Sequence, residues 1–112
     1  MRLNGRPRLT EKAFLGMVVQ LARLHGWLVM HQRPARTRGG WRTAVQGDPG
    51  FPDLVLLRDG VLIVAELKAD DGLLTAAQKR WLEAFRAAGI GGGVWRPRDF
   101  ALIELTLRRD GP

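Results

Sequence analysis

Hydrophobic residues recur at helical spacing in two stretches, one near the beginning of the chain and one in its second half. The first stretch places apolar residues three or four positions apart: Phe14, Met17, Val18, Leu21 and Leu24. With Thr10 as a favourable N-cap, this pattern predicts a helix over 10–25. The apolar face of the second stretch consists of Ala77, Trp81, Ala84, Phe85 and Ala88. It predicts a helix over 75–88, opened by a capping box between Thr75 and Gln78.

Two apolar stretches flank an Asp-Gly pair in the middle of the chain. Residues 53–57 and 61–67 are rich in Leu, Val and Ile, and Asp59-Gly60 is typical of a tight two-residue β-turn. The pattern therefore predicts a β-hairpin. Because both strands are apolar on both faces, we expect helices to cover the sheet on both sides.

Shorter apolar runs complete the predicted fold. Residues 27–30 and 93–95 are expected to form strands, and 100–107 fits either a terminal helix or a strand. The order is then roughly αβββαβ, with no internal repeat. We expect one α/β domain over 1–112, built on a central mixed β-sheet flanked by helices.

The interval 31–50 has no apolar periodicity and is rich in arginine and glycine. It is predicted to be a basic, flexible loop, either simply solvated or able to follow a phosphate backbone. Trp41 could stack on a base or anchor its own loop, and His31 could reach substrate or be structural. The candidate DNA-binding residues are Arg33, Arg36, Arg38, Arg42, Trp41 and His31.

Composition narrows the class of partner. The formal net charge is +7 and the isoelectric point about 11.4, which favours a polyanion, with nucleic acid ahead of an anionic membrane. The absence of cysteine excludes disulfides and thiolate metal sites. No signal peptide and no apolar run of the ~20 residues that a membrane span needs are visible, so we expect a soluble, cytoplasmic protein.

The predicted hairpin places charged residues together. If Asp59 and Gly60 form the turn, Arg58 faces Val61, and counting outward places Asp53 opposite Glu66. Lys68 lies two residues beyond Glu66 and therefore on the same face. The hairpin is thus expected to gather two carboxylates and one ammonium beside an apolar sheet.

Two facing carboxylates among apolar neighbours need compensation. Lys68 could offset one charge, and a divalent cation could offset more; oxygen ligands favour Mg²⁺ or Mn²⁺ over zinc. Such an ion polarises phosphate and activates water, and Lys68 could orient that water, accept its proton or stabilise developing charge. These parts suffice for phosphodiester hydrolysis. The alternative is that Asp53 merely opens a turn and Glu66 pairs with Lys68 on the surface.

These residues also resemble a known family. Pro52-Asp53 followed by Glu66-Leu67-Lys68 is similar to the Pro-Asp…(Asp/Glu)-x-Lys pattern of restriction-endonuclease-like nucleases. The flanking residues resemble the VRR-NUC branch more closely: Gly50, Phe51, Leu54, Gln78 and Trp95-Arg96-Pro97. The likeness runs from about residue 11 to the C-terminus. Two departures are Leu15, where a polar residue is expected, and a long basic insert over 33–46.

The resemblance implies roles for individual residues. Asp53 and Glu66 would be metal ligands together with the backbone carbonyl of Leu67, and Lys68 would be the catalytic lysine. Gln78 would lie beside the site and help position metal, water or phosphate, although it is equally explained as the capping partner of Thr75. A further carboxylate on the first helix is implied, for which Glu11 is the candidate; otherwise Glu11 only meets the helix dipole.

The sequence therefore predicts a Mg²⁺- or Mn²⁺-dependent endonuclease acting on DNA. The resemblance implies a structure-selective enzyme, such as a Holliday-junction or flap nuclease of replication, recombination or repair, in a phage or bacterial setting. A homodimer is expected because two strands need two active sites. The alternatives are a DNA-binding module that does not cut and an RNA-processing nuclease of the same fold.

Overall fold

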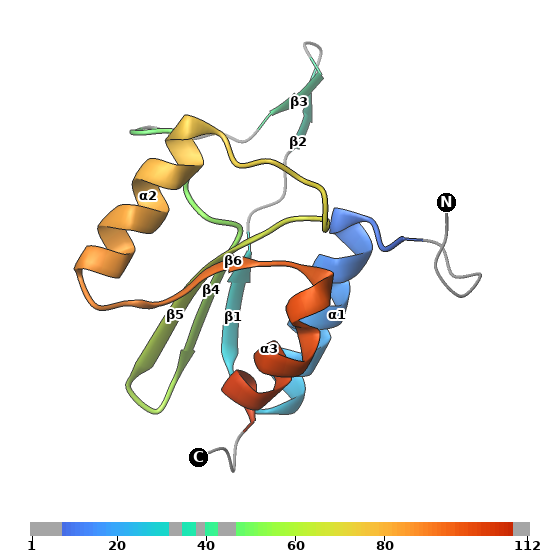
Figure 1. Cartoon of the computed structure of the whole chain (residues 1–112), viewed down its shortest axis with the longest axis vertical. Coiled ribbons are helices and arrows are strands. Elements are labelled where there is room, and N and C mark those ends of the chain that lie inside the picture. Colours follow the sequence, from blue (N-terminus) through green and yellow to red (C-terminus); the bar gives the residue numbers. More distant parts are fainter. Residues whose placement is uncertain (1–7, 32–34, 38–39, 43–46, 109–112) are drawn as a thin grey trace.

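The computed structural model describes residues 8–31, 35–37, 40–42 and 47–108 of the 112-residue chain. Its elements follow one another as in Figure 1. They are α1 (Glu11–Leu24), β1 (Leu28–His31), β2 (Ala35–Thr37), β3 (Gly40–Arg42), β4 (Leu54–Arg58), β5 (Val61–Leu67), α2 (Ala76–Ala87), β6 (Gly91–Trp95), the 3₁₀ turn η2 (Pro97–Asp99) and α3 (Phe100–Leu107).

The core of the fold is a four-stranded mixed sheet in the order β1-β4-β5-β6. The pairs β1–β4 and β4–β5 are antiparallel, whereas β5–β6 is parallel and is connected through α2. In Figure 1, α1 and α3 lie together on one side of the sheet and α2 lies on the other. The predicted α/β class, a central mixed sheet flanked by helices, is confirmed. Residues 100–107 form a helix rather than a strand.

Both long helices begin where the capping residues predict. The hydroxyl of Thr10 accepts a hydrogen bond from the backbone N–H of Ala13 at 3.1 Å. At the start of α2, Thr75 and Gln78 form the predicted capping box, each side chain accepting from the other's backbone N–H. These bonds satisfy amide groups that the first turn of a helix leaves unpaired.

The central hairpin has the predicted register. Arg58 pairs with Val61 and Leu54 pairs with Ala65. Asp59 has φ of 50° and Gly60 has φ of 79°, as a tight turn with two left-handed residues requires. The next pair outward from Leu54 and Ala65 is Asp53 and Glu66, so the turn sets the position of the charged residues.

The main hydrophobic core lies between the sheet and the helix pair α1 and α3. It is made of buried residues from all of these elements: Phe14, Val18, Ala22, Leu54, Leu56, Ile63, Ala65, Leu67, Ile103 and Leu107. Trp27 closes one end, where its indole N–H donates to the carbonyl of Leu107 at 2.9 Å. The guanidinium of Arg58 stacks 4.3 Å above the Trp27 ring and donates to the same carbonyl. The cation–π pair of Arg58 and Trp27 therefore stabilises this end of the core.

Helices lie on both sides of the sheet, as expected, but the face beneath α2 is covered only in part. Helix α2 contacts β5 and β6 but leaves the outer half of this face open. Leu28 and Met30 of β1 and Leu57 of β4 are 71%, 59% and 44% exposed. Since Leu28 pairs with Leu57, these side chains share one face. One helix is too narrow to span four strands, because neighbouring strands lie about 4.8 Å apart and a helix is about 10 Å wide.

The interval 31–50, predicted to lack regular structure, contains a short hairpin. Strands β2 and β3 pair antiparallel, with Ala35 opposite Arg42 and Thr37 opposite Gly40. Strands of three residues are too short to leave a period-2 apolar pattern, which is why the sequence did not reveal them. Residues 32–34, 38–39 and 43–46 lie outside the described part. No helix within the described residues is long and apolar enough to cross a bilayer.

Candidate metal centre

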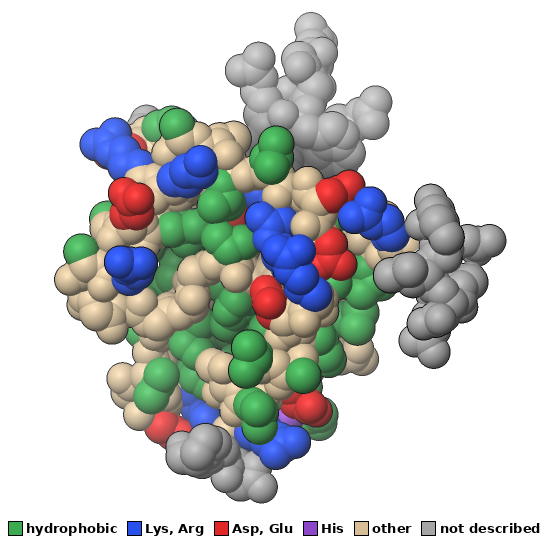
Figure 2. All heavy atoms as spheres, viewed as in Figure 1, with side chains coloured by type: hydrophobic (Ala, Val, Ile, Leu, Met, Phe, Trp, Pro, Cys, Tyr) green, Lys and Arg blue, Asp and Glu red, His purple; other side chains and the backbone are tan. Residues whose placement is uncertain are grey.

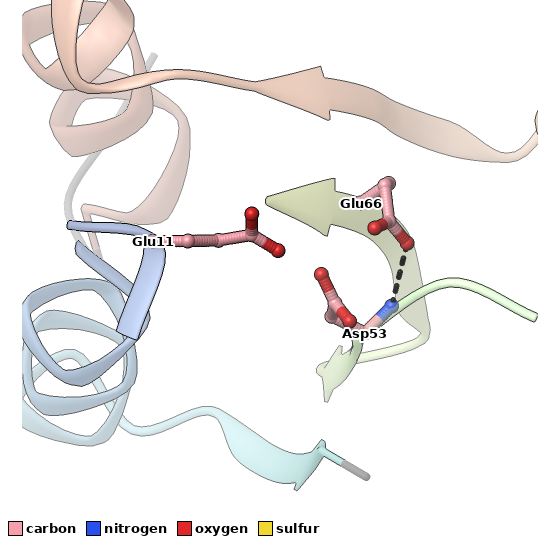
Figure 3. Close-up of side chains that lie close together, drawn as sticks. All are labelled: Glu11, Asp53 and Glu66. Atoms are coloured by element: carbon pink, nitrogen blue, oxygen red, sulfur yellow. Dashed lines mark hydrogen bonds between the residues drawn. The ribbon is translucent and has the colours of Figure 1, made fainter. Parts of the chain in front are cut away.

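Three carboxylates from different parts of the fold converge at one end of the sheet. Glu11 is the first residue of α1, Asp53 immediately precedes β4, and Glu66 lies near the end of β5. One carboxylate oxygen from each lies within 4.8 Å of the other two. Figure 3 shows the three side chains pointing toward a common space between α1 and the two strands. The two predicted ligands are thus joined by Glu11, as the resemblance implied.

Hydrogen bonds hold Asp53 and Glu66 against each other. The backbone N–H of Asp53 donates to Oε1 of Glu66 at 3.2 Å, drawn as a dashed line in Figure 3. In return, Oδ2 of Asp53 accepts from the backbone N–H of Leu67 at 3.0 Å. Each carboxylate therefore receives a backbone donor from the opposite strand. The prediction that the hairpin brings Asp53 opposite Glu66 is confirmed.

Glu66 is the most strongly perturbed group of the site. Its side chain is 2% exposed, and its pKa is raised from 4.5 to about 8. Burial, which disfavours the charged form, is the largest cause, and the charge and side-chain hydrogen bonding of Asp53 raise the pKa further, whereas the backbone N–H of Asp53 lowers it. The ammonium of Lys68 opposes the shift from 3.9 Å, the distance between Nζ and Oε2 of Glu66. An acidic pair kept in so unfavourable an environment is typical of a functional site.

Gln78 both caps α2 and lies beside the acidic pair, while a role toward metal, water or phosphate stays a prediction. Its Oε1 accepts the Thr75 backbone N–H of the capping box at 2.9 Å. Its Nε2 donates to Oε2 of Glu66 at 3.1 Å. Because the carbonyl oxygen is held by the cap, the amide nitrogen is aimed at the carboxylate. The start of α2 therefore orients Glu66.

Lys68 is held at the site by its backbone and by the loop that follows it. Its N–H donates to the carbonyl of Trp95 at 3.0 Å, which extends the β5–β6 ladder. The guanidinium of Arg96 donates to the carbonyls of Ala69 and Gly72, each at 2.7 Å, and so closes the loop beneath the Lys68 side chain. In the sequence Arg96 was only part of a family motif. Nothing in its spacing pointed to this positioning role.

Gly50 lets the segment before Asp53 pack against α2. It has φ of +92°, and a β-carbon there would lie 2.5 Å from the carbonyl carbon of Ala77. The indole N–H of Trp81 donates to the carbonyl of Pro49 at 3.0 Å and holds the segment in place. Only glycine combines this backbone conformation with so close an approach. The glycine of the Gly-x-Pro-Asp pattern thus sets where Asp53 enters the site.

The predicted DNA-binding residues are only partly placed. Arg33 and Arg38 lie outside the described residues, and Arg36, Trp41 and Arg42 are placed by backbone alone, on β2 and β3. His31 ends β1; its Nδ1 is buried and has no hydrogen-bond partner among the described residues. The assignment of all six residues to DNA contact stays a prediction.

The donor set fits a hard divalent cation. Carboxylate oxygens are the ligands preferred by Mg²⁺ and Mn²⁺, and neither histidine nor cysteine belongs to the cluster. The raised pKa of Glu66 fits as well, because a cation would remove the repulsion that keeps the carboxyl protonated. The roles of the Leu67 carbonyl as a ligand and of Lys68 as a catalytic group stay predictions.

Comparison with known proteins identifies the fold. No family model and no curated protein sequence matches the chain. A solved structure described as "VRR_NUC domain protein" matches with a TM-score of 0.63 and 22% identity, over 90% of this chain and 92% of that chain. A second, described as "VRR_NUC domain", matches with a TM-score of 0.52 and 25% identity, over 86% and 92%. These matches support the VRR-NUC assignment that the motif predicted.

Proposed function

From a VRR-NUC fold with three carboxylates gathered at one end of its sheet, we propose that this chain is a divalent-metal-dependent endonuclease that hydrolyses DNA phosphodiester bonds. The observation that carries the proposal is the convergence of Glu11, Asp53 and Glu66 within 4.8 Å, with the ammonium of Lys68 3.9 Å from Glu66. Carboxylates and a lysine so placed have the composition of a metal-assisted phosphodiester-cleaving site.

Each residue has a distinct part in this proposal. Asp53, Glu66 and Glu11 would hold Mg²⁺ or Mn²⁺, joined by the carbonyl of Leu67. When bound, the ion would polarise a phosphate oxygen and lower the pKa of a water molecule. Lys68 would orient the attacking water or stabilise negative charge on the phosphoryl group. Gln78, Arg96 and Gly50 position these groups and need not touch the substrate.

DNA is the proposed substrate because the chain is strongly basic and has this fold. A net charge of +7 attracts a phosphate backbone. Selectivity for branched DNA, such as a Holliday junction or a flap in replication, recombination or repair, completes the proposal. RNA cleavage by the same chemistry is its rival, and parallel substrates separate the two.

A cleavage assay tests the function directly. Labelled four-way junction, flap, linear duplex and single-stranded DNA, with matching RNA, are incubated with Mg²⁺ or Mn²⁺. We expect cutting of DNA by the parent protein, with a branched substrate preferred, and none by Lys68→Ala purified in the same way. If the parent binds DNA but cuts no substrate with either ion, the nuclease proposal is wrong and a non-cleaving binding module replaces it.

We further propose that two copies of the domain over 1–112 act together in the cytoplasm, the compartment that a chain without cysteine fits. The uncovered sheet face with Leu28, Met30 and Leu57 is the apolar surface on which copies could pair. Sedimentation at micromolar concentration is expected to give the mass of a dimer. Replacing Met30 with lysine should yield monomers; a parent that sediments as a monomer at all concentrations contradicts the pairing.

A further inference from the structure

A cavity of about 270 Å³ lies between α2 and the strands β5 and β6. Among the residues that line it are Val64, Leu82, Phe85, Gly92, Gly93 and Val94. Figure 2 shows hydrophobic surface beside α2, with charged side chains of both signs along the helix. We name this space the α2–β6 cavity. Its lining is mostly apolar, yet it is open to solvent.

The α2–β6 cavity begins beside the metal centre. Val94 is the β6 residue that pairs with Glu66, and Val64 lies on the same face of β5 as Glu66. On the helix, Lys79 follows Gln78, whose amide donates to Glu66. A group that enters the cavity would therefore lie on the same face of the sheet as Glu66, one strand away from it.

The strand that borders the cavity is built from glycines. A β-carbon on Gly92, at φ of +116°, would lie 2.1 Å from the carbonyl oxygen of Val64, so this position requires glycine. At Gly93 a β-carbon would have no heavy atom within 4 Å, so the glycine leaves open space above the backbone. Phe85 supplies an aromatic ring on the opposite wall. A flat ring can approach such a surface closely.

Three charged residues of α2 line the cavity: Lys79, Glu83 and Arg86. Lys79 and Arg86 stand seven residues apart on α2, two turns along the same side of the helix. Among the described residues neither forms an ion pair within 4.0 Å. With Glu83 between them, these residues leave a net charge of one cation beside an apolar space, which suits a nucleotide, whose base is flat and whose phosphates are anionic.

We propose that the α2–β6 cavity receives one nucleobase of the strand that is cut, unstacked from its neighbours and next to the phosphate at the metal centre. This inference rests on the proposed nuclease function and deepens it. The volume lies just below the ~300–1,000 Å³ of pockets for drug-sized ligands, which fits a single base. Unstacking is easiest where a nucleotide is already unpaired, so the cavity gives a physical reason for preferring branched DNA.

An abasic scan of the substrate tests this proposal on the parent protein. In a flap substrate, one base at a time is removed at the three nucleotides on either side of the cut. Removing the base at one position should lower kcat/KM about tenfold or more, because the contacts of one bound base are lost. Removing the base at any other position should change kcat/KM little. A uniform response at all six positions overturns the proposal but leaves the nuclease function intact.

Filling the cavity provides the matched variant. Leu82→Trp places a larger side chain in the cavity, and Leu102→Trp makes the same change on the exposed side of α3, where the leucine is 66% exposed. We expect Leu82→Trp to lower cleavage and to abolish the position-specific abasic effect, while Leu102→Trp behaves as the parent. If Leu82→Trp does not fold, the abasic scan of the parent decides alone.

A binding measurement keeps the test independent of cleavage. 2-Aminopurine is placed at each of the six positions, and its emission is followed as the parent binds the flap without metal. One position should brighten as the base leaves the stack, and Leu82→Trp should remove that change. No brightening at any position overturns the proposal, even if the parent cuts no DNA and the nuclease function has failed separately.

Discussion

Replacing Glu66 with glutamine is expected to lower the rate of DNA cleavage by at least ~10²-fold. Substitution of groups that only orient metal ligands already lowers metal affinity or activity by ~10–100-fold, and Glu66 is proposed to be a ligand itself. Glutamine keeps the shape of the side chain but removes the charge that would bind the cation. The same variant should lose the thermal stabilisation that Mg²⁺ or Mn²⁺ gives the parent, about 2.7 kcal/mol at an ion concentration 100 times the dissociation constant. Steady-state cleavage and thermal unfolding, each with and without metal, measure the two effects.

The control for this substitution is a glutamate-to-glutamine replacement outside the acidic cluster. Glu104→Gln, on α3, removes a carboxylate that is not part of the acidic cluster. It should cut DNA and respond to metal as the parent does. If Glu66→Gln retains both cleavage and stabilisation by metal, Glu66 is not a ligand and the proposed centre is wrong.

Metal binding is expected to become tighter as pH rises, by about tenfold per pH unit below pH 8. The reason is that Glu66, with a pKa raised to about 8, must lose its proton before its carboxylate can bind a cation. Calorimetric titration with Mg²⁺ in two buffers of different ionisation enthalpy should show release of close to one proton near pH 6.5. The number of protons released on metal binding should fall toward zero above pH 9.

The raised pKa of Glu66 also determines how the stability of the metal-free protein changes with pH. Between about pH 4.5 and 8 the folded chain keeps the Glu66 proton while the unfolded chain has lost it. The free energy of unfolding of the metal-free protein should therefore fall as pH rises through this range, by an amount on the order of a few kcal/mol. Glu66→Gln should show a smaller fall in urea-denaturation series. For the metal-binding prediction above, an affinity that is constant between pH 6 and 8 would contradict the raised pKa of Glu66.

The central hairpin was determined by local sequence. An Asp-Gly turn accepts two residues of positive φ, and the alternation of side chains then fixes every pair outward to Asp53 and Glu66. Thr10 and Thr75 likewise set the starts of α1 and α2 through bonds to their own first turns. These features depend on contacts within a few residues or across one turn, and so they can be read from the chain.

The environment of the hairpin was decided by tertiary structure. Glu11 reaches Asp53 only because α1 packs on the sheet, and the Gln78 amide reaches Glu66 only because α2 crosses the other face. The raised pKa of Glu66 follows from that packing, since desolvation depends on what covers the side chain. The spacing of residues along the sequence does not predict how close Glu11 lies to Asp53 or Gln78 to Glu66.

The same division explains what the sequence left undetermined. Apolar residues on both faces of β4 and β5 predicted helices on both sides of the sheet, and these are present, but the width of α2 leaves Leu57 exposed beside β1. The need for glycine in β6 also arises from packing, because Gly92 lies against the Val64 carbonyl, beside a cavity. The sequence by itself determined which charged groups face each other, because hairpin geometry is local. Tertiary structure decided their protonation and the space beside them, because burial and cavities arise only when distant segments pack.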